Sequence, residues 1–188
     1  MEYSLKDLNF STTMPMKTKE KRNNLPNGIF EDAEAKGLVA KYIARADKNL
    51  ELMNIVSELS TNKEAQKALA LPEEYVNDEW VIITAYYSMY LAALALLAKL
   101  GYRSKTHTAT IIALEAFFVK KELIDQKYLL MFKHAQNQID QQDIIDLSKR
   151  KEDRETAQYE VTKAVTHSIV EASMKNAVSF VNKVKELL

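Results

Sequence analysis

The chain has 188 residues and a mass of 21.5 kDa, the size of one ordinary domain with a single hydrophobic core. With 3 glycines and 3 prolines, it lacks the turn residues of many-stranded β folds and the clustered glycines of phosphate-binding loops. Because it contains no cysteine, disulfides, thiolate metal sites and cysteine nucleophiles are excluded, and a cytoplasmic location is expected. The 26 basic and 26 acidic residues balance to a net charge of zero, so any binding of nucleic acid has to use a local patch.

The first 35 residues are predicted to form an extended or partly disordered N-terminal arm. They hold Pro15, Pro26 and a pair of asparagines, and they show no sustained apolar period. The opening stretch MEYSLKDLNF has no basic region followed by an apolar run, so it does not resemble a secretory signal. Residues 36–188 are predicted to form the folded domain.

Helical periodicity predicts a first amphipathic helix from near Gly37 to about Leu59. Its apolar side chains recur at spacings of three, four and three: Ile43, Ala46, Leu50 and Met53. A polar connection containing a short helical turn is expected to follow, and then a long apolar helix from about Glu74 to Leu100, with Gly101 as its C-cap.

The long apolar helix carries no charge from Val81 to Ala98, at the lower length limit for crossing a membrane. Its three tyrosines, however, sit in the middle of the segment and not at its two ends. We therefore predict the buried central helix of a bundle and no membrane association.

Two further helices are predicted in the second half of the chain. Ser104 or Thr106 can cap a third helix, whose apolar residues are expected to be Ile112, Ala116, Val119 and Leu123. The stretch 125–146 is mixed in character and is predicted to be irregular, with short helical pieces. The last helix has the clearest stripe, formed by Val170, Met174, Ala177, Val181, Val184 and Leu188. Together these elements predict an all-α helical bundle.

No metal or cofactor is expected. The three histidines lie on different predicted elements without a metal-ligand spacing, and no G-x-S-x-G sequence is present for acyl transfer.

Two polar clusters are candidate ligand sites. The first is the turn that contains Arg103, Lys105 and His107, where a helix N-terminus and two cations would favour an anion; the alternative is a plain capped turn. The second joins Arg154 to Gln158 and Tyr159 at helical spacing. The alternative there is a structural role for Tyr159, whose buried hydroxyl would only be satisfied by a hydrogen bond.

Four segments in this order resemble the HEPN superfamily, in particular small archaeal and bacterial HEPN proteins encoded beside minimal nucleotidyltransferases. They are YIARADKNLELM (42–53), AYYSMYLAALALLAKLG (85–101), SKTH (104–107), and the R-x-x-x-Q-Y element of Arg154 to Tyr159 with the final amphipathic helix. The resemblance covers residues 37–188. It implies an up-and-down bundle of about four to five helices that forms a homodimer, with the tyrosine-rich helix or the last helix as candidate dimer faces.

The resemblance also bears on catalysis. Nuclease members of the superfamily carry an R-x(4–6)-H motif, in which the arginine binds the scissile phosphate and the histidine is a general acid or base in metal-independent RNA cleavage. Arg154 matches the arginine, but Tyr159 stands at the histidine position and has a reference pKa near 10. Gln158 also replaces the acid that close relatives carry.

These departures favour a non-catalytic HEPN module that binds nucleic acid, a nucleotide or a partner protein, through a site that includes Arg103–His107, Arg154, Gln158 and Tyr159. A role in a toxin–antitoxin pair with a minimal nucleotidyltransferase is one expectation. The alternative is a toxin-like endoribonuclease in which Arg154 binds phosphate and Tyr159 or His107 transfers protons. A third hypothesis is an assembly subunit without a ligand.

Overall fold

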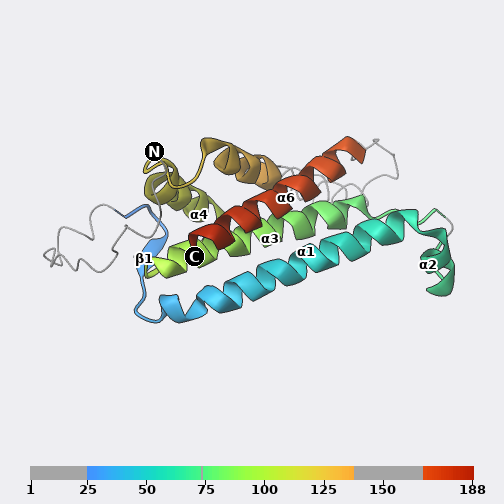
Figure 1. Ribbon diagram of the computed structural model, residues 1–188, viewed down its shortest axis with the longest axis horizontal. Helices are drawn as coiled ribbons and strands as arrows, with labels where there is room; N and C mark the ends of the chain where they lie inside the picture. The colour runs from blue at the N-terminus through green and yellow to red at the C-terminus, as the bar shows by residue number, and fades with distance from the viewer. Residues whose placement is uncertain (1–24, 73, 138–166) are drawn as a thin grey trace, which may run out of the picture.

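The computed structural model describes most of the chain, namely residues 25–72, 74–137 and 167–188. Three long helices form the body of the molecule: α1 (Val39–Thr61), α3 (Asp78–Lys99) and α6 (His167–Leu187). They lie side by side, with α3 and α6 running in one direction and α1 in the other (Figure 1). The predicted all-α bundle is confirmed.

α3 is the central helix, since it contacts α1, α4 and α6. Its buried side chains face almost every direction, which explains why no charge is tolerated from Val81 to Ala98. By length and composition α3 could cross a membrane, but 72% of its apolar window is buried inside the protein. The predicted buried central helix is therefore confirmed.

α1 and α6 bury the stripes that their periodicity predicts. On α1, Ala46 and Met53 are fully buried, while Ile43 and Leu50 pack against the core as partly buried residues. On α6 the buried members of the predicted stripe are Val170, Ala177, Val181 and Val184, and Met174 packs against the core as a partly buried residue; Ser173 and Phe180 are buried as well. The last residue of the predicted stripe, Leu188, is exposed.

Polar contacts fasten the C-terminal end of α6 to both neighbouring helices. The Lys99 ammonium of α3 donates hydrogen bonds to the Leu187 carbonyl at 2.5 Å and to the Leu188 oxygen at 3.2 Å. A cation is favourable there because the last carbonyls of a helix lack partners inside the helix. Lys185 pairs with Asp47 of α1 at 2.6 Å.

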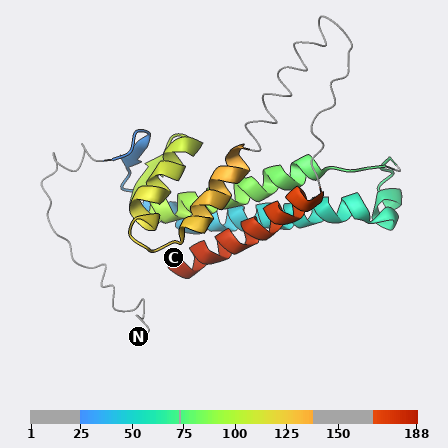
Figure 2. The same cartoon turned by 90° about the horizontal axis from the view of Figure 1, so that it is seen from above.

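A small sheet ties the segment before α1 to the end of α3. Strand β1 (Ile29–Glu31) pairs antiparallel with β2 (Tyr102–Ser104), with Phe30 opposite Arg103. Figure 2 shows β1, in blue, at one end of the bundle. The chain reaches α1 through the short helix η3 (Ala35–Leu38). Residues 25–35, which belong to the predicted arm, thus lie against the bundle, whereas residues 1–24 fall outside the described part.

The connection between α1 and α3 contains a short helix, α2 (Lys63–Ala68), as the sequence predicts. The Asn62 side chain caps it by accepting a hydrogen bond from the Ala65 N–H at 3.0 Å. After α3, Gly101 adopts a positive φ of 84°, the conformation expected of a glycine that ends a helix.

The third predicted helix is α4 (His107–Leu114), which continues into the π-helical turn η4 (Glu115–Val119). Of its two predicted caps, Thr106 caps α4 by accepting a hydrogen bond from the Ala109 N–H at 3.1 Å. The predicted apolar face was wrong at Ile112, which is 47% exposed, while Ile111 and Leu114 are buried. Since this stretch is apolar on every side, its periodicity does not distinguish the core face.

The segment after η4 is more regular than predicted. Residues 126–137 are helical and bury Leu129, Phe132 and Ala135 against the core, so the expectation of an irregular stretch was wrong for this part. The three buried residues are spaced by three, and Leu130 and His134 between them are exposed. The remainder of the stretch, 138–146, lies outside the described residues.

Candidate functional site

Three tyrosines of α3 surround the histidine that begins α4. Tyr86, Tyr87, Tyr90 and His107 form this tyrosine–histidine cluster. The His107 ring lies 4.1 Å from the Tyr90 ring, 5.4 Å from Tyr86 and 6.1 Å from Tyr87, measured between centroids. Tyr86 and Tyr90 are one helical turn apart and stack with nearly parallel rings, 6.2 Å between centroids.

The side chains of the tyrosine–histidine cluster differ in their exposure to solvent. Tyr86 is completely buried, Tyr90 and His107 are partly buried, and Tyr87 is 41% exposed. Burial raises the pKa of the Tyr90 phenol above its usual value, and the side-chain hydrogen bond with Thr110 opposes this as a smaller effect. At neutral pH the Tyr90 phenol is therefore neutral, and the tyrosines of the cluster offer ring faces and hydroxyl groups to a ligand.

A buried hydroxyl fixes the orientation of His107. The Tyr86 hydroxyl oxygen lies 2.6 Å from Nδ1 of the imidazole, a hydrogen-bond distance whose direction follows the tautomer of the histidine. A histidine with one nitrogen held in this way has its ring plane and its other nitrogen set in advance. That arrangement suits either a ligand contact or a proton transfer.

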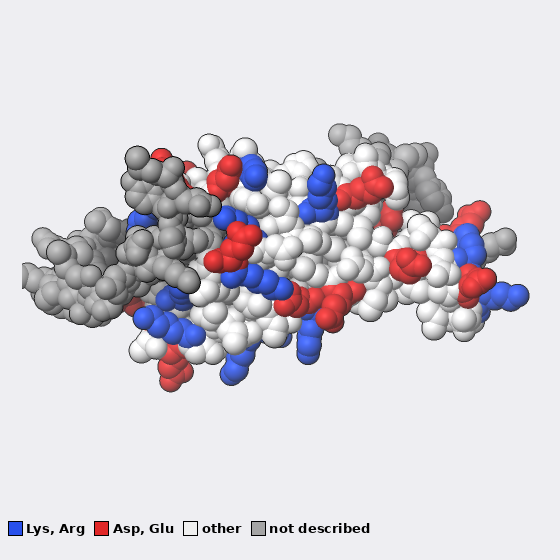
Figure 3. Space-filling view, in the orientation of Figure 1, with Lys and Arg blue, Asp and Glu red and all other residues white. Residues whose placement is uncertain are grey.

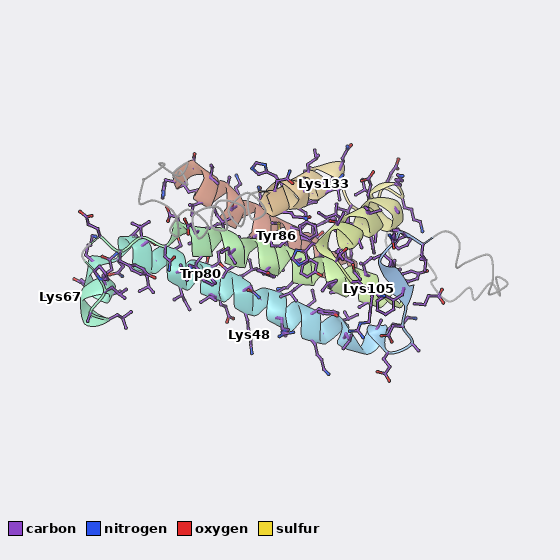
Figure 4. The ribbon with its side chains drawn as sticks, turned by 180° about the vertical axis from the view of Figure 1, so that it is seen from behind. Lys48, Lys67, Trp80, Tyr86, Lys105 and Lys133 are labelled. Carbon is purple, nitrogen blue, oxygen red and sulfur yellow. The ribbon has the colours of Figure 1, made fainter. Side chains whose placement is uncertain are left out.

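The two cations of the predicted turn have separate partners. Arg103 forms an ion pair with Asp32 at 3.0 Å, and Lys105 lies over the Phe30 ring at 5.6 Å from its centroid. Both side chains are exposed, and Figure 4 shows Lys105 beyond Tyr86, toward the end of the bundle that is opposite to Lys67. The ion pair with Asp32 raises the pKa of Arg103, and Tyr42 of α1 acts in the same direction, so the guanidinium stays charged.

The Asp32–Arg103 pair makes folding stability depend on pH. The hydrogen bond from Arg103, followed by that from the Glu34 N–H, lowers the pKa of Asp32 below its usual 3.8. The stabilisation is therefore present above pH 3.8 and is lost as pH falls through the lower pKa of the folded state. We expect Asp32→Asn to be less stable than wild type at pH 6 and to approach it as the pH falls below 3.8 and through the lower pKa of the folded state, in urea titrations over this range. A constant difference across the range would contradict the assignment.

The structure describes only part of the predicted site. It places Arg103, Lys105 and His107 at one end of the bundle, whereas Arg154, Gln158 and Tyr159 lie outside the described residues. Sequence reasoning missed the role of Tyr86 and Tyr90. The available signal was the spacing of four residues between these tyrosines on a helix that precedes the histidine turn.

The other histidines stand apart from this cluster. His134 is exposed, and His167 is exposed at the start of α6, where Nε2 pairs with Glu171 at 3.2 Å. Within the described ranges no group of three or more histidine, aspartate or glutamate side chains could hold a metal ion.

A pocket lies between α4 and the helix over 126–137, and no residue of the tyrosine–histidine cluster lines it. It has a volume of about 300 Å³ and is lined by Thr108, Ile111, Ile112, Lys133, Gln136 and Asn137. The Lys133 ammonium is bound to Glu115 at 3.1 Å. This pairing neutralises the cation nearest to the pocket, so the lining offers little attraction for an anion.

The charges on the broad face formed by α1 and α6 are mixed. Acidic and basic side chains are interspersed over the visible part of this face (Figure 3). The described residues therefore form no large basic patch there for nucleic acid.

Comparison with known proteins agrees with the fold. A family model described as HEPN domain matches residues 60–187, from the end of α1 through α6. No curated protein and no solved structure matches the chain. The family match spans more than half of the chain and contains the tyrosine–histidine cluster, and the chain therefore belongs to the HEPN domain family.

Proposed function

We propose that this chain is a non-catalytic HEPN module that binds RNA or a nucleotide at the tyrosine–histidine cluster. The observation that carries the proposal is the position of His107, which is held by the Tyr86 hydroxyl at 2.6 Å and is flanked by the exposed Tyr87 ring. Bases stack on aromatic side chains in a largely sequence-independent way. Lys105 is exposed on the adjoining turn, where its ammonium would attract phosphate, whereas Arg103 is already paired with Asp32.

The absence of catalysis is argued from the sequence. Tyr159 occupies the position at which nuclease members of the family carry their histidine. A phenol with a pKa near 10 is a poor proton carrier at neutral pH. Arg154 would then contribute phosphate binding without cleavage.

Binding is tested by the fluorescence anisotropy of a labelled single-stranded RNA. Tyr87→Ala is expected to weaken binding by roughly 5- to 150-fold, the effect of losing one stacked base. Lys105→Ala is expected to weaken it and to make the salt dependence shallower. Lys67→Ala is the matched control, because Lys67 is an exposed cation at the opposite end of the molecule (Figure 4).

Equal affinity of wild type, Tyr87→Ala and Lys105→Ala would contradict a binding site at this cluster. Arg103→Ala is unsuitable for the comparison, since it also breaks the ion pair with Asp32.

A second candidate function is a toxin-like endoribonuclease. The observation in its favour is the fixed imidazole of His107, because general acid–base catalysis needs an oriented group of this kind. Growth arrest on expression, relieved by a co-encoded minimal nucleotidyltransferase, would support it. The same co-expression experiment tests the minimal nucleotidyltransferase partner that the family resemblance implies.

A further inference from the structure

Three exposed cations follow one another along the outer edge of α1. Lys41, Arg45 and Lys48 are spaced by four and then three residues, which places them on one stripe of the helix. Figure 4 shows Lys48 on the edge of α1 that points away from α3. In the sequence from 36 to 50 the only acidic residue is Asp47. The three cations are called the α1 row.

The charges of the α1 row are not neutralised by the parts of the protein that the structure describes. Asp47 pairs with Lys185 of α6 at 2.6 Å, and no described carboxylate lies within ion-pair distance of a cation of the row. Arg103 and Lys133, in contrast, each have a carboxylate partner. Exposed basic residues gathered along one helix are the electrostatic footprint of a nucleic-acid-binding surface.

The α1 row begins beside the tyrosine–histidine cluster. Tyr42, the residue after Lys41, interacts electrostatically with Tyr90 of the cluster and with Arg103 of β2. The start of α1 therefore lies against the elements that carry the cluster. From Lys41 to Lys48 the row extends over seven residues, about 10 Å along the helix. A strand that is bound at the cluster can thus continue along α1.

We propose that the α1 row holds the phosphate backbone of a single-stranded RNA, one base of which stacks at the tyrosine–histidine cluster. This inference rests on the proposed function, because it extends the same site. Proteins that bind single strands combine a cationic track for the backbone with aromatic side chains for the bases. The length of the row matches roughly three phosphates, at the 3.4 Å spacing of charges along one stacked strand. The site therefore favours an oligonucleotide over a mononucleotide.

An acidic protein helix is the competing occupant of this edge of α1. The stripe of the row continues into Leu52 and Ile55, which are 46% and 56% exposed. A partner helix with acidic and apolar residues could contact both halves of such a stripe. It would not, however, require the cations to begin next to an aromatic cluster. The position of the row beside Tyr42 and Tyr90 therefore favours RNA.

The first test compares two labelled RNAs, a trinucleotide and a strand of about 15 nucleotides, by fluorescence anisotropy. Wild type is expected to bind the longer RNA at least about 10-fold more tightly, because only that RNA reaches the α1 row. Arg45→Gln combined with Lys48→Gln should remove most of this difference. It should also make the salt slope of log K shallower by about 1.4, since each phosphate contact to a single strand contributes about 0.7. Glutamine preserves helix propensity, so helix content by circular dichroism should be unchanged.

Lys67→Gln combined with Lys175→Gln is the matched control. Both lysines are exposed, on α2 and α6, and this double variant loses the same charge. Equal affinity of wild type for the two RNAs would overturn the proposal. An α1 double variant with the affinity and salt slope of wild type would also overturn it, and would leave the outer edge of α1 to a protein partner.

Tyr87→Ala distinguishes failure of this inference from failure of the proposed function. It is expected to weaken binding of both RNAs, whereas the α1 double variant is expected to spare the trinucleotide. If Tyr87→Ala weakens binding and the α1 double variant does not, only the phosphate track is overturned. A wild type that binds neither RNA would overturn both proposals.

Discussion

Replacing Phe132 with alanine is expected to lower the free energy of unfolding by about 3–5 kcal/mol. Phe132 is fully buried, and its ring lies 5.5 Å from Tyr86, 6.4 Å from Tyr90 and 5.8 Å from Phe180, between centroids. It therefore joins α3, α6 and the helix over 126–137. The cavity left by the ring would lie between three helices that cannot all close on it.

The measurement is urea unfolding at one fixed protein concentration, since self-association would make the midpoint concentration-dependent. Leu130→Ala on the same helix is the control, because Leu130 is 56% exposed and its truncation should change stability by no more than about 0.5 kcal/mol. A loss below about 1 kcal/mol for Phe132→Ala would show that this helix does not pack as described.

The second large effect is expected for Gly28→Ala, at about 2–3 kcal/mol of lost stability. Gly28 has a φ of +88°, a conformation that strains residues with a side chain. An added Cβ would also lie 2.9 Å from the Cβ of Ala109 in α4. The turn before β1 would have to move away from the helix that carries His107.

Gly37→Ala is the matched control for this prediction. A Cβ at Gly37 meets nothing within 4 Å, and its φ is not positive, so alanine should be neutral or stabilise by up to about 1 kcal/mol. Thermal unfolding of the two variants side by side distinguishes them. Equal melting temperatures would contradict the close contact of the Gly28 turn, which precedes β1, with Ala109 of α4.

The long helices could be predicted because their patterns are strong and local. Ala46 and Met53 on α1, and Val170 and Val181 on α6, are buried as the 3.6-residue period requires. The face of α4 could not be predicted, because residues 109–114 offer apolar side chains in nearly every direction. The π-helical turn that follows changes the register again.

The small sheet could not be predicted from local sequence patterns. Each strand has three residues, and the pairing of Phe30 with Arg103 joins positions more than 70 residues apart. Nothing in the sequence around Asp32 predicts that its carboxylate binds Arg103. Such long-range contacts are decided by how the helices pack, and a one-dimensional pattern does not contain that information.

The candidate site also combines features that local sequence predicts with a long-range contact that it does not predict. The histidine turn was found from its cations and its capping residue, since these are local signals. Tyr86 and His107 lie 21 positions apart in the sequence, on two different helices, and their contact is seen only in the structure. The structure therefore shows His107, which the sequence presents as one polar residue of the turn, to be an oriented side chain inside an aromatic cluster.

The most direct test of the account is RNA cleavage by wild type and Arg154→Ala, side by side, over several RNAs and without added metal. The account predicts that wild type binds RNA, as seen by anisotropy in the same samples, and that neither protein cleaves it. Cleavage by wild type that disappears in Arg154→Ala would contradict the account and establish an endoribonuclease. His107→Ala and Tyr159→Phe would then identify the proton-transferring group.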